Sequence, residues 1–209
     1  MLKKIIFTIL FSFFLITDSY SEESFISLEK LKNHDMDKVI FLRHALAPGN
    51  GDPSNFNVND CSTQRNLDQV GIDQSSMLGN TLKKIGIKFS KIYSSFWCRC
   101  KDTALNMNIG EFKTHEGLNS FYEKHADKKL TLIKLNNLVN SFDKSGGPYL
   151  LVTHYVNILA FTGLSTSSGG MVAFDLNSKE SSHIKINDKF LLSSLSFITS
   201  YSPSITSPI

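Results

Sequence analysis

The amino-acid sequence predicts an α/β protein, built as a three-layer α/β/α sandwich around a largely parallel central sheet. Three short runs predict strands, at residues 38–43, 91–95 and 149–153, and the first and third have the apolar character of buried strands. A helix is expected after each run, and the segments 67–85 and 130–142 have the apolar spacing of an amphipathic helix. Strands that alternate with helices in this way favour a parallel sheet covered on both faces.

The other segments complete this pattern. The polar residues 22–37 are expected to be helical or irregular. Helices are expected over 67–85, 97–107 and 130–142 and from about residue 157, and the runs 171–176 and 183–186 are expected to form a closing hairpin.

A long loop is expected at residues 45–64. This stretch holds two prolines, two glycines and four asparagines, a composition typical of turns. Loops longer than about 12 residues inside compact domains usually carry function.

The composition limits the class of protein. The chain has 209 residues and a mass of 23.4 kDa, which suits one domain with its own core. Hydrophobic residues make up 41% of it, too many for an intrinsically disordered chain. The formal net charge of +3 is too small to indicate nucleic-acid binding, so we expect no nucleic-acid partner. The oligomeric state stays open.

Residues 1–21 have the pattern of a secretory signal peptide. Lys3 and Lys4 precede a mostly apolar run of 12 residues, and small residues stand before Glu22, where cleavage is expected. The alternative is an uncleaved membrane anchor, although a spanning helix needs about 20 apolar residues. We therefore expect a periplasmic or secreted domain at 22–192, with no stable membrane span after cleavage, and a loosely ordered tail at 193–209.

The predicted export affects the expected state of the three cysteines. In an oxidising compartment, Cys61 is free to form a disulfide with either Cys98 or Cys100, which leaves one thiol unpaired. No C-x-x-C spacing or neighbouring histidine indicates a zinc site, so we expect no metal.

Arginine is rare in this sequence, and its positions are informative. Of the 22 basic residues only three are arginine: Arg43, Arg65 and Arg99. A protein that otherwise uses lysine is expected to keep arginine where a planar, bidentate donor is required.

Two of these arginines and two histidines stand at the predicted strand ends. Arg43 and His44 end the first strand, Arg99 follows the second, and His154 ends the third. In open α/β sheets, ligands bind beyond the carboxyl ends of the strands. A cationic cluster at this edge favours a dianionic phosphoryl group.

Three motifs follow one another at these strand ends. They are Leu42-Arg43-His44-Ala45, the frame S-x-x-x-R-x-x-x-T-A from Ser95 to Ala104, and Val152-Thr153-His154. Together they resemble the histidine phosphatase superfamily, which includes phosphoglycerate mutases and acid phosphatases, over about residues 38–177. The stretches 47–53 and 60–67 further resemble a small exported bacterial branch without a large cap domain. The resemblance implies a phosphoglycerate mutase-like fold.

The resemblance also implies roles for the residues of these motifs. His44 would be the nucleophile and form a phosphohistidine. Arg43 and Arg99 would hold the non-bridging oxygens, and His154 would stabilise charge in the transition state. Arg65 is either a further substrate contact or a brace for the long loop. No metal or other cofactor is implied.

The sequence departs from the superfamily near the second histidine and at the general acid. Tyr155 replaces the usual glycine and is expected to line the substrate site. The acid of the mutase-like members has no clean match, which leaves Glu123, Glu116 and Asp60 as possible acids. A site without a positioned acid would favour a good leaving group, such as a phosphohistidine or an acyl phosphate.

The function expected from these features is that of an exported, metal-independent phosphatase. It would hydrolyse a phosphomonoester or a related phosphoryl group on a small phosphorylated substrate, through a phosphohistidine at His44. A catalytically inactive module that binds phosphate or a sugar phosphate is the first alternative, because no acid is identified. An intramolecular phosphate mutase is the second.

Overall fold

The structure is a computed structural model that describes residues 24–32 and 37–186. The predicted signal peptide at 1–21, the tail at 193–209 and the domain boundaries at 22 and 192 lie outside the described residues. No helix of the described residues is long and apolar enough to cross a bilayer.

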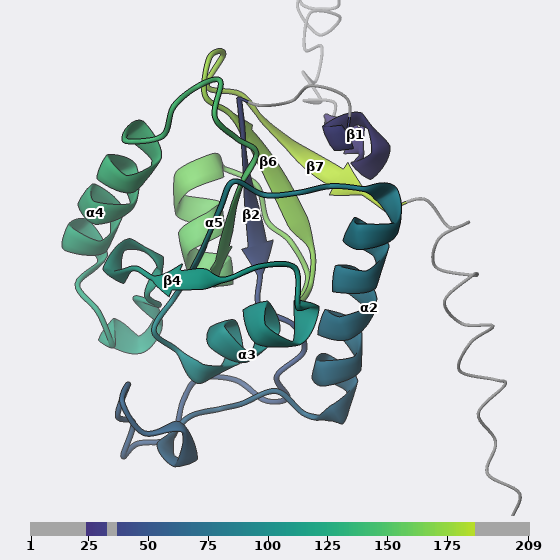
Figure 1. The fold of residues 1–209 in the computed structure, drawn as a ribbon. Helices are drawn as coiled ribbons and strands as arrows, with labels where there is room; N and C mark the ends of the chain where they lie inside the picture. The colour runs from purple at the N-terminus through teal and green to yellow at the C-terminus, as the bar shows by residue number, and fades with distance from the viewer. Residues whose placement is uncertain (1–23, 33–36, 187–209) are drawn as a thin grey trace, which may run out of the picture.

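A seven-stranded sheet forms the middle layer (Figure 1). Its strand order is β1-β7-β6-β2-β5-β3-β4, and β6 alone runs against the others within the described sheet. The α/β prediction with a largely parallel sheet is therefore confirmed. The strands are β1 (Phe25–Ser27), β2 (Lys38–Arg43), β3 (Lys91–Ser94), β4 (Phe112–Thr114), β5 (Tyr149–Thr153), β6 (Met171–Asp175) and β7 (Ser181–Lys185).

Helices cover both faces of this sheet. They are α2 (Gln69–Ile85), α3 (Cys98–Met107), α4 (Lys128–Asn140) and α5 (Tyr155–Thr162). Helix α2 begins after Asp68, whose carboxylate accepts the backbone N–H of Gly71, and ends at Gly86, which has φ +85°. Gly79 allows α2 to pack closely on α3, because a Cβ there would lie 1.9 Å from the Met107 carbonyl oxygen.

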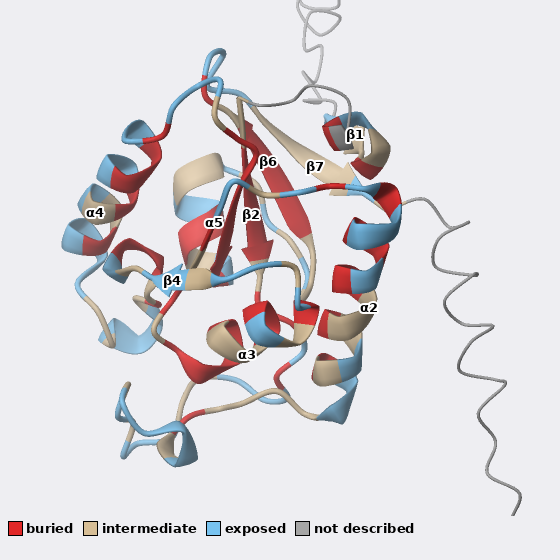
Figure 2. Ribbon diagram, viewed as in Figure 1, coloured by how far each residue is buried: buried red, intermediate tan, exposed pale blue. Residues whose placement is uncertain are grey.

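The central strands are buried (Figure 2). Their side chains pack in two separate hydrophobic cores, one on each face of the sheet. Successive side chains of a strand point to opposite faces. In β2, Ile40 and Leu42 pack in the core that contains residues of α2 and α3. Val39 and Phe41 pack in the core that contains residues of α4 and α5. All four are fully buried, which explains why this strand is continuously apolar instead of alternating.

Two edge strands were missed by the sequence analysis. The segment 22–37, expected to be helical or irregular, contains strand β1 before the 3₁₀ helix η2 (Leu28–Lys32), and β4 follows α3. Each of these strands has three residues and pairs with one neighbour, β1 with β7 and β4 with β3. So short a strand depends on its partner for stability, and its own sequence carries almost no periodic signal.

The long loop lies at the carboxyl end of β2, where the β2 arrow points in Figure 1. It runs from His44 to Asp68 and contains one short 3₁₀ helix, η3 (Cys61–Thr63). The predicted hairpin is also present, as β6 and β7 pair antiparallel with Val172 opposite His183. The loop and the strand ends therefore meet on one side of the sheet.

Candidate active site

The two motif histidines lie side by side because their strands are parallel neighbours. Arg43 of β2 is paired with Thr153 of β5, so the residues that follow them are also adjacent. The backbone N–H of His44 donates to the Thr153 carbonyl oxygen at 2.9 Å. The ring centroids of His44 and His154 are 5.4 Å apart, and both side chains are almost fully buried.

Hydrogen bonding determines which nitrogen of His44 carries its proton. Nδ1 lies 2.8 Å from the carbonyl oxygen of Ala45, which can only accept. Nδ1 is therefore the protonated nitrogen, and Nε2 keeps its lone pair. Burial, followed by the charge of Arg99, lowers the pKa of His44 to about 3. The imidazole is thus neutral near pH 7, and its Nε2 has the lone pair that a nucleophile needs.

His154 forms its hydrogen bond through Nε2, whereas His44 uses Nδ1. Nε2 of His154 lies 3.0 Å from the Ser95 hydroxyl. That hydroxyl also lies 3.2 Å from Asn119 Oδ1, which accepts the backbone N–H of Phe96. Ser95 has one proton to donate, so His154 carries its own proton on Nε2 when Ser95 donates to Asn119, and on Nδ1 when Ser95 donates to Nε2. Nδ1 has no hydrogen-bond partner in the described part of the chain. Burial and then the charge of Arg99 lower the pKa of His154 well below its ordinary value.

Helix α3 locks the first motif in place. The backbone N–H of Ala45, directly after His44, donates to the Thr103 hydroxyl at 3.0 Å. The same hydroxyl donates to the Arg99 carbonyl oxygen one turn earlier. The S-x-x-x-R-x-x-x-T-A frame thus supplies a hydroxyl for each motif histidine. Ser95 contacts the ring of His154, and Thr103 binds the backbone directly after His44.

All three arginines of the chain line one cavity of about 180 Å³. The cavity also contains His44 and His154, so the five cationic or ionisable residues predicted from the strand ends and from Arg65 are brought together. Tyr155, expected to line the substrate site, lies in the same wall. Five wall residues were not identified from the sequence: Asn50, Gly51, Ser120, Tyr122 and Val156.

Arg99 lines this cavity, and one edge of its guanidinium has no hydrogen-bond partner among the described residues. A guanidinium has five N–H donors. Nη1 donates to Asp52 Oδ1 and to the Arg65 carbonyl oxygen, and Nη2 donates to Asp52 Oδ2. The Nε–H and one Nη2–H remain, and they form the lateral edge of the fork. Nε is buried without a partner among the described residues.

Arg43 also has a buried hydrogen-bond donor without an acceptor among the described residues. Its Nη1 donates to the Thr166 carbonyl oxygen at 3.0 Å, while its Nε is buried without a partner in the described structure. A buried donor without an acceptor costs roughly 1–3 kcal/mol. Two such donors in one cationic cavity indicate a site for an oxyanion.

Arg65 braces the long loop and also lines the cavity. Its Nε donates to the Gly51 carbonyl oxygen at 2.8 Å, and its Nη1 donates to the Ala47 carbonyl oxygen. These bonds brace the long loop. The same side chain lines the cavity, and its Nη2 has no hydrogen-bond partner among the described residues.

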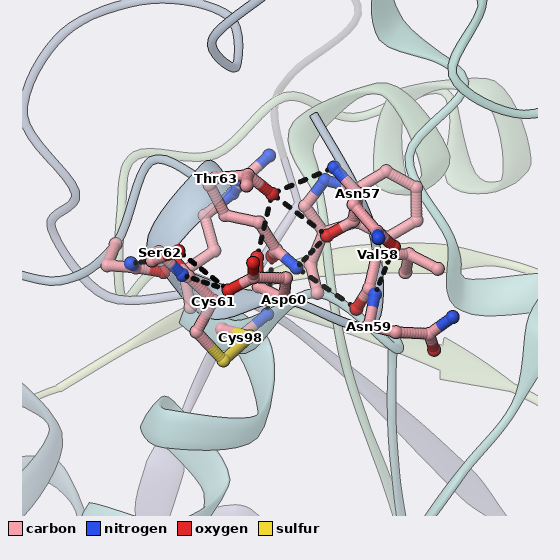
Figure 3. Close-up of a disulfide and its surroundings, with 12 residues drawn as sticks. Asn57, Val58, Asn59, Asp60, Cys61, Ser62, Thr63 and Cys98 are labelled. Atoms are coloured by element: carbon pink, nitrogen blue, oxygen red, sulfur yellow. Dashed lines mark hydrogen bonds between the residues drawn. A yellow bond between two sulfur atoms is a disulfide. The ribbon is translucent and has the colours of Figure 1, made fainter. Parts of the chain in front are cut away.

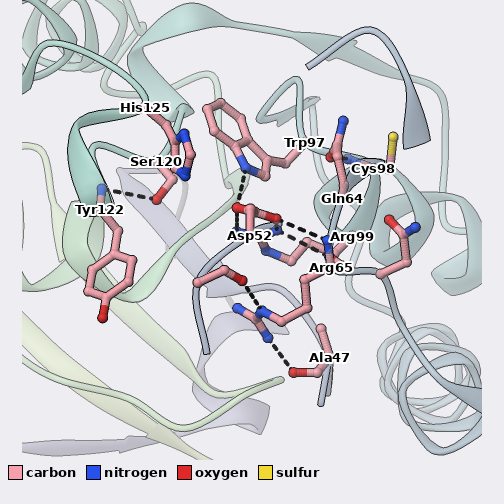
Figure 4. A network of polar contacts seen from close by, with 12 residues as sticks. Ala47, Asp52, Gln64, Arg65, Trp97, Cys98, Arg99, Ser120, Tyr122 and His125 are labelled. Atoms are coloured by element: carbon pink, nitrogen blue, oxygen red, sulfur yellow. Dashed lines mark hydrogen bonds and ion pairs between the residues drawn. The ribbon is translucent and has the colours of Figure 1, made fainter. Parts of the chain in front are cut away.

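Asp52 is a site residue that the sequence analysis missed. Its side chain is 3% exposed and forms a bidentate ion pair with Arg99 (Figure 4). Its oxygens also accept the backbone N–H of Arg65 and the indole N–H of Trp97. Burial raises the pKa of Asp52, but the hydrogen bond and charge of Arg99 outweigh this effect, so the pKa is lowered. The sequence signal was an aspartate between glycine and proline inside a functional loop.

The cysteine pairing left open by the sequence is Cys61 with Cys98 (Figure 3). This disulfide joins the long loop to the first residue of α3, directly before Arg99. Gln64 reinforces the connection, because its Oε1 accepts the backbone N–H of Cys98 at 2.9 Å. Cys100 is a buried free thiol 3.5 Å from His154 Nε2, and burial raises its pKa to about 12.

Loss of the disulfide is expected to destabilise the protein and the site together. The two cysteines are 37 positions apart, and a cross-link that closes a loop of this size stabilises by roughly 2–4 kcal/mol. Thermal unfolding of the reduced protein should therefore begin about 5–15 °C lower. Activity should also fall, because the loop carries Asp52 and Arg65.

The double variant Cys61→Ser/Cys98→Ser provides the control for that measurement. It should unfold at the temperature of the reduced wild type and should not respond to reductant. Equal unfolding temperatures for the oxidised and reduced wild type would show that the disulfide does not fix the loop.

The three possible acids lie in different surroundings. Glu116 pairs with Lys134 on the surface, and Asp60 is exposed and accepts the backbone N–H of Ser62. Neither lines the cavity. Glu123 lies against the cavity wall, since a Cβ on Gly51 would be 2.7 Å from both of its carboxylate oxygens. Its backbone has φ +53°, an unusual value for a residue with a side chain.

In residues 24–32 and 37–186, no group of three or more His, Cys, Asp and Glu side chains is placed to hold a metal ion. The positive charge of the cavity comes from the three guanidinium groups.

Comparison by sequence finds no matching protein-family model and no matching curated protein. Comparison of structures finds clear likeness. A candidate alpha-ribazole-5'-P phosphatase from Escherichia coli has a TM-score of 0.52 at 15% identity, over 72% of this chain and 96% of its own. This likeness shows that the chain has the fold of phosphoglycerate mutase-like phosphatases.

Two further matches have lower scores. The mycobacterial glucosyl-3-phosphoglycerate phosphatase in complex with inorganic phosphate has a TM-score of 0.49 at 14% identity, over 72% of this chain and 97% of its own. The protein histidine phosphatase SixA in complex with tungstate has a TM-score of 0.48 at 18% identity, over 70% and 93%.

Proposed function

We propose that this protein is an exported, metal-independent phosphatase of the histidine phosphatase superfamily. It hydrolyses a phosphomonoester or a related phosphoryl group through a phosphohistidine at His44. The observation that carries the proposal is the convergence of all three arginines and two neutral histidines on one small cavity. Solved structures of the same fold with phosphatase descriptions support it.

The charge of the site suits a phosphomonoester. Three guanidinium groups and the Asp52 carboxylate leave a formal charge of +2, because both histidines are neutral at pH 7. A phosphomonoester carries close to two negative charges at this pH. The unpartnered Nε donors of Arg43 and Arg99 supply hydrogen bonds to its oxygens.

The reaction proceeds in two steps. In the first, Nε2 of His44 forms a bond to phosphorus while the bond from phosphorus to the leaving oxygen breaks, and an acid donates a proton to that oxygen. In the second, water attacks the phosphohistidine, its proton passes to the carboxylate of that acid, and the N–P bond breaks to release phosphate. Arg43 and Arg99 stabilise the charge on the equatorial oxygens, and His154 does so through Nδ1–H when Ser95 donates to its Nε2.

Glu123 is our proposal for this acid. Of the three carboxylates considered, it alone lies against a residue of the cavity wall. Glu116 and Asp60 instead contact Lys134 and Ser62, which lie outside that wall, so we assign them no role in catalysis.

Glu123→Gln is expected to affect substrates according to their leaving groups. The kcat/KM for glycerol phosphate, whose alkoxide leaves poorly, should fall about 10²-fold because protonation of the leaving oxygen is lost. The kcat/KM for p-nitrophenyl phosphate, whose phenolate leaves without help, should change less than about threefold, because kcat/KM reports the first step and not the hydrolysis of the phosphohistidine. Steady-state kinetics on both substrates, with Glu116→Gln as the matched control, measures this difference. An equal loss of kcat/KM on both substrates would remove Glu123 as the acid.

Export is proposed from the leader sequence and the cysteine chemistry. The Cys61–Cys98 disulfide supports an oxidising compartment. Residues 1–21 have the signal-peptide pattern described above. Fractionation of expressing cells should recover the chain, cut before Glu22, in the periplasm or the medium.

Turnover of p-nitrophenyl phosphate in the presence of a metal chelator tests the proposed function. We expect hydrolysis that the chelator does not change. A folded chain that binds phosphate without hydrolysing this substrate would instead be a phosphate-binding module.

A further inference from the structure

We propose that Asp52 is a positioning residue that turns the lateral edge of Arg99 toward the transferring phosphoryl group. This inference rests on the proposed function and assigns a residue that the three motifs do not contain. Asp52 stands behind the cavity and does not belong to its wall. It would therefore act through Arg99 and not by touching the substrate.

The stereochemistry of the ion pair carries the proposal. Asp52 binds the end of the guanidinium fork, with Oδ1 to Nη1 at 2.7 Å and Oδ2 to Nη2 at 3.1 Å. The Arg65 carbonyl oxygen takes the second Nη1–H. Only the adjacent lateral donors, Nε–H and one Nη2–H, are then left. A guanidinium is planar and rigid, so fixing one edge fixes the direction of the other.

Asp52 is itself fixed from three directions. Each carboxylate oxygen accepts two hydrogen bonds, from Arg99 and Arg65 at Oδ1 and from Arg99 and Trp97 at Oδ2. The side chain is almost fully buried, and its loop is joined to α3 by the disulfide. Figure 4 shows the carboxylate between Trp97 and the two arginines. Its orientation cannot change without breaking several of these bonds.

If Asp52 positions Arg99, its replacement should weaken binding of the transition state much more than binding of the ground state. Asp52→Asn replaces one acceptor oxygen with an NH₂ group that faces a guanidinium N–H, so the bidentate pair is lost. Arg99 then loses its alignment, but the cavity gains one positive charge. Ordinary attraction for phosphate should persist, whereas alignment with the five-coordinate transition state should be lost.

The experiment compares four forms of the full chain: wild type, Asp52→Asn, Arg99→Ala and the double variant. We expect Asp52→Asn to lower kcat on p-nitrophenyl phosphate about 10²-fold. The Kd of vanadate, which mimics the five-coordinate transition state, should weaken by a similar factor. The Kd of inorganic phosphate should change less than about threefold. In the Arg99→Ala background, Asp52→Asn should change kcat and both Kd values less than about threefold.

Asp60→Asn is the matched control, an aspartate of the same loop that lies outside the cavity and whose replacement keeps a good capping side chain. Its kcat should stay within about twofold of wild type.

Several outcomes would overturn the inference. A folded Asp52→Asn variant with a kcat within about threefold of wild type would do so. A 10²-fold loss that persists in the Arg99→Ala background would show that Asp52 acts elsewhere. Failure of Asp52→Asn to fold, cured by adding Arg99→Ala, would make Asp52 a counter-ion for stability only.

The two proposals fail in different ways. Absence of turnover in the wild type would overturn the proposed phosphatase. The vanadate and phosphate affinities of the four forms would still decide the role of Asp52, because they need no turnover.

Discussion

His44→Ala is expected to lower kcat at least about 10⁴-fold and to abolish any phosphorylated form of the protein. The expected loss is large because the proposed nucleophile itself is removed. Nδ1–H of His44 is bound to the Ala45 carbonyl oxygen, so Nε2 is the nitrogen with an available lone pair. Burial keeps this imidazole neutral. Steady-state kinetics on p-nitrophenyl phosphate measures the loss.

The control for His44 is a histidine on another strand. His183 lies in β7 and does not line the cavity, so His183→Gln should keep kcat within about twofold of wild type. A His44→Ala protein that retains a tenth of wild-type activity would show that another residue, or water itself, attacks the substrate.

Arg99→Lys is expected to lower kcat about 10³-fold, although it keeps the positive charge. Lysine carries a single ammonium group on a flexible stem and cannot bind Asp52 with one edge while it offers two parallel donors to the substrate. The loss reflects transition-state stabilisation, which is worth about 10²–10³ for one well-placed donor. Steady-state kinetics of Arg99→Lys and Arg99→Ala measures this loss of kcat, and the two variants should lose similar activity.

Lys101→Ala is the matched control on the same helix. Lys101 lies two residues further along α3 and outside the cavity, so removing its charge should change kcat less than about twofold. An Arg99→Lys protein with more than a tenth of wild-type kcat would mean that charge alone, and not the planar fork, is what the site requires.

The central features of the fold were predictable because they depend on local pattern. The runs 38–43 and 149–153 coincide with β2 and β5, since strands buried on both faces are continuously apolar. The convergence of His44 and His154 followed from the rule that parallel strands end at the same edge of the sheet. Arg65 also lines the cavity, in agreement with the argument from the scarcity of arginine.

The features that were not predicted depend on contacts between distant residues. Strands β1 and β4 are too short to show a period, and they exist through their pairing with β7 and β3. Asp52 acquires its role from Arg99, 47 positions away, and no local pattern reports that contact. The cysteine partner was ambiguous for the same reason, because only the path of the loop decides between Cys98 and Cys100.

The most direct test of the central claim is to trap the phosphorylated protein. The wild type is mixed with p-nitrophenyl phosphate, quenched in alkali within the first turnovers, and digested for mass spectrometry. We predict a phosphoryl group on the peptide that contains His44, stable in alkali, lost in acid, and missing from His44→Ala. Steady turnover with no phosphoryl group on His44, or with the group on a different residue, would contradict the proposed mechanism.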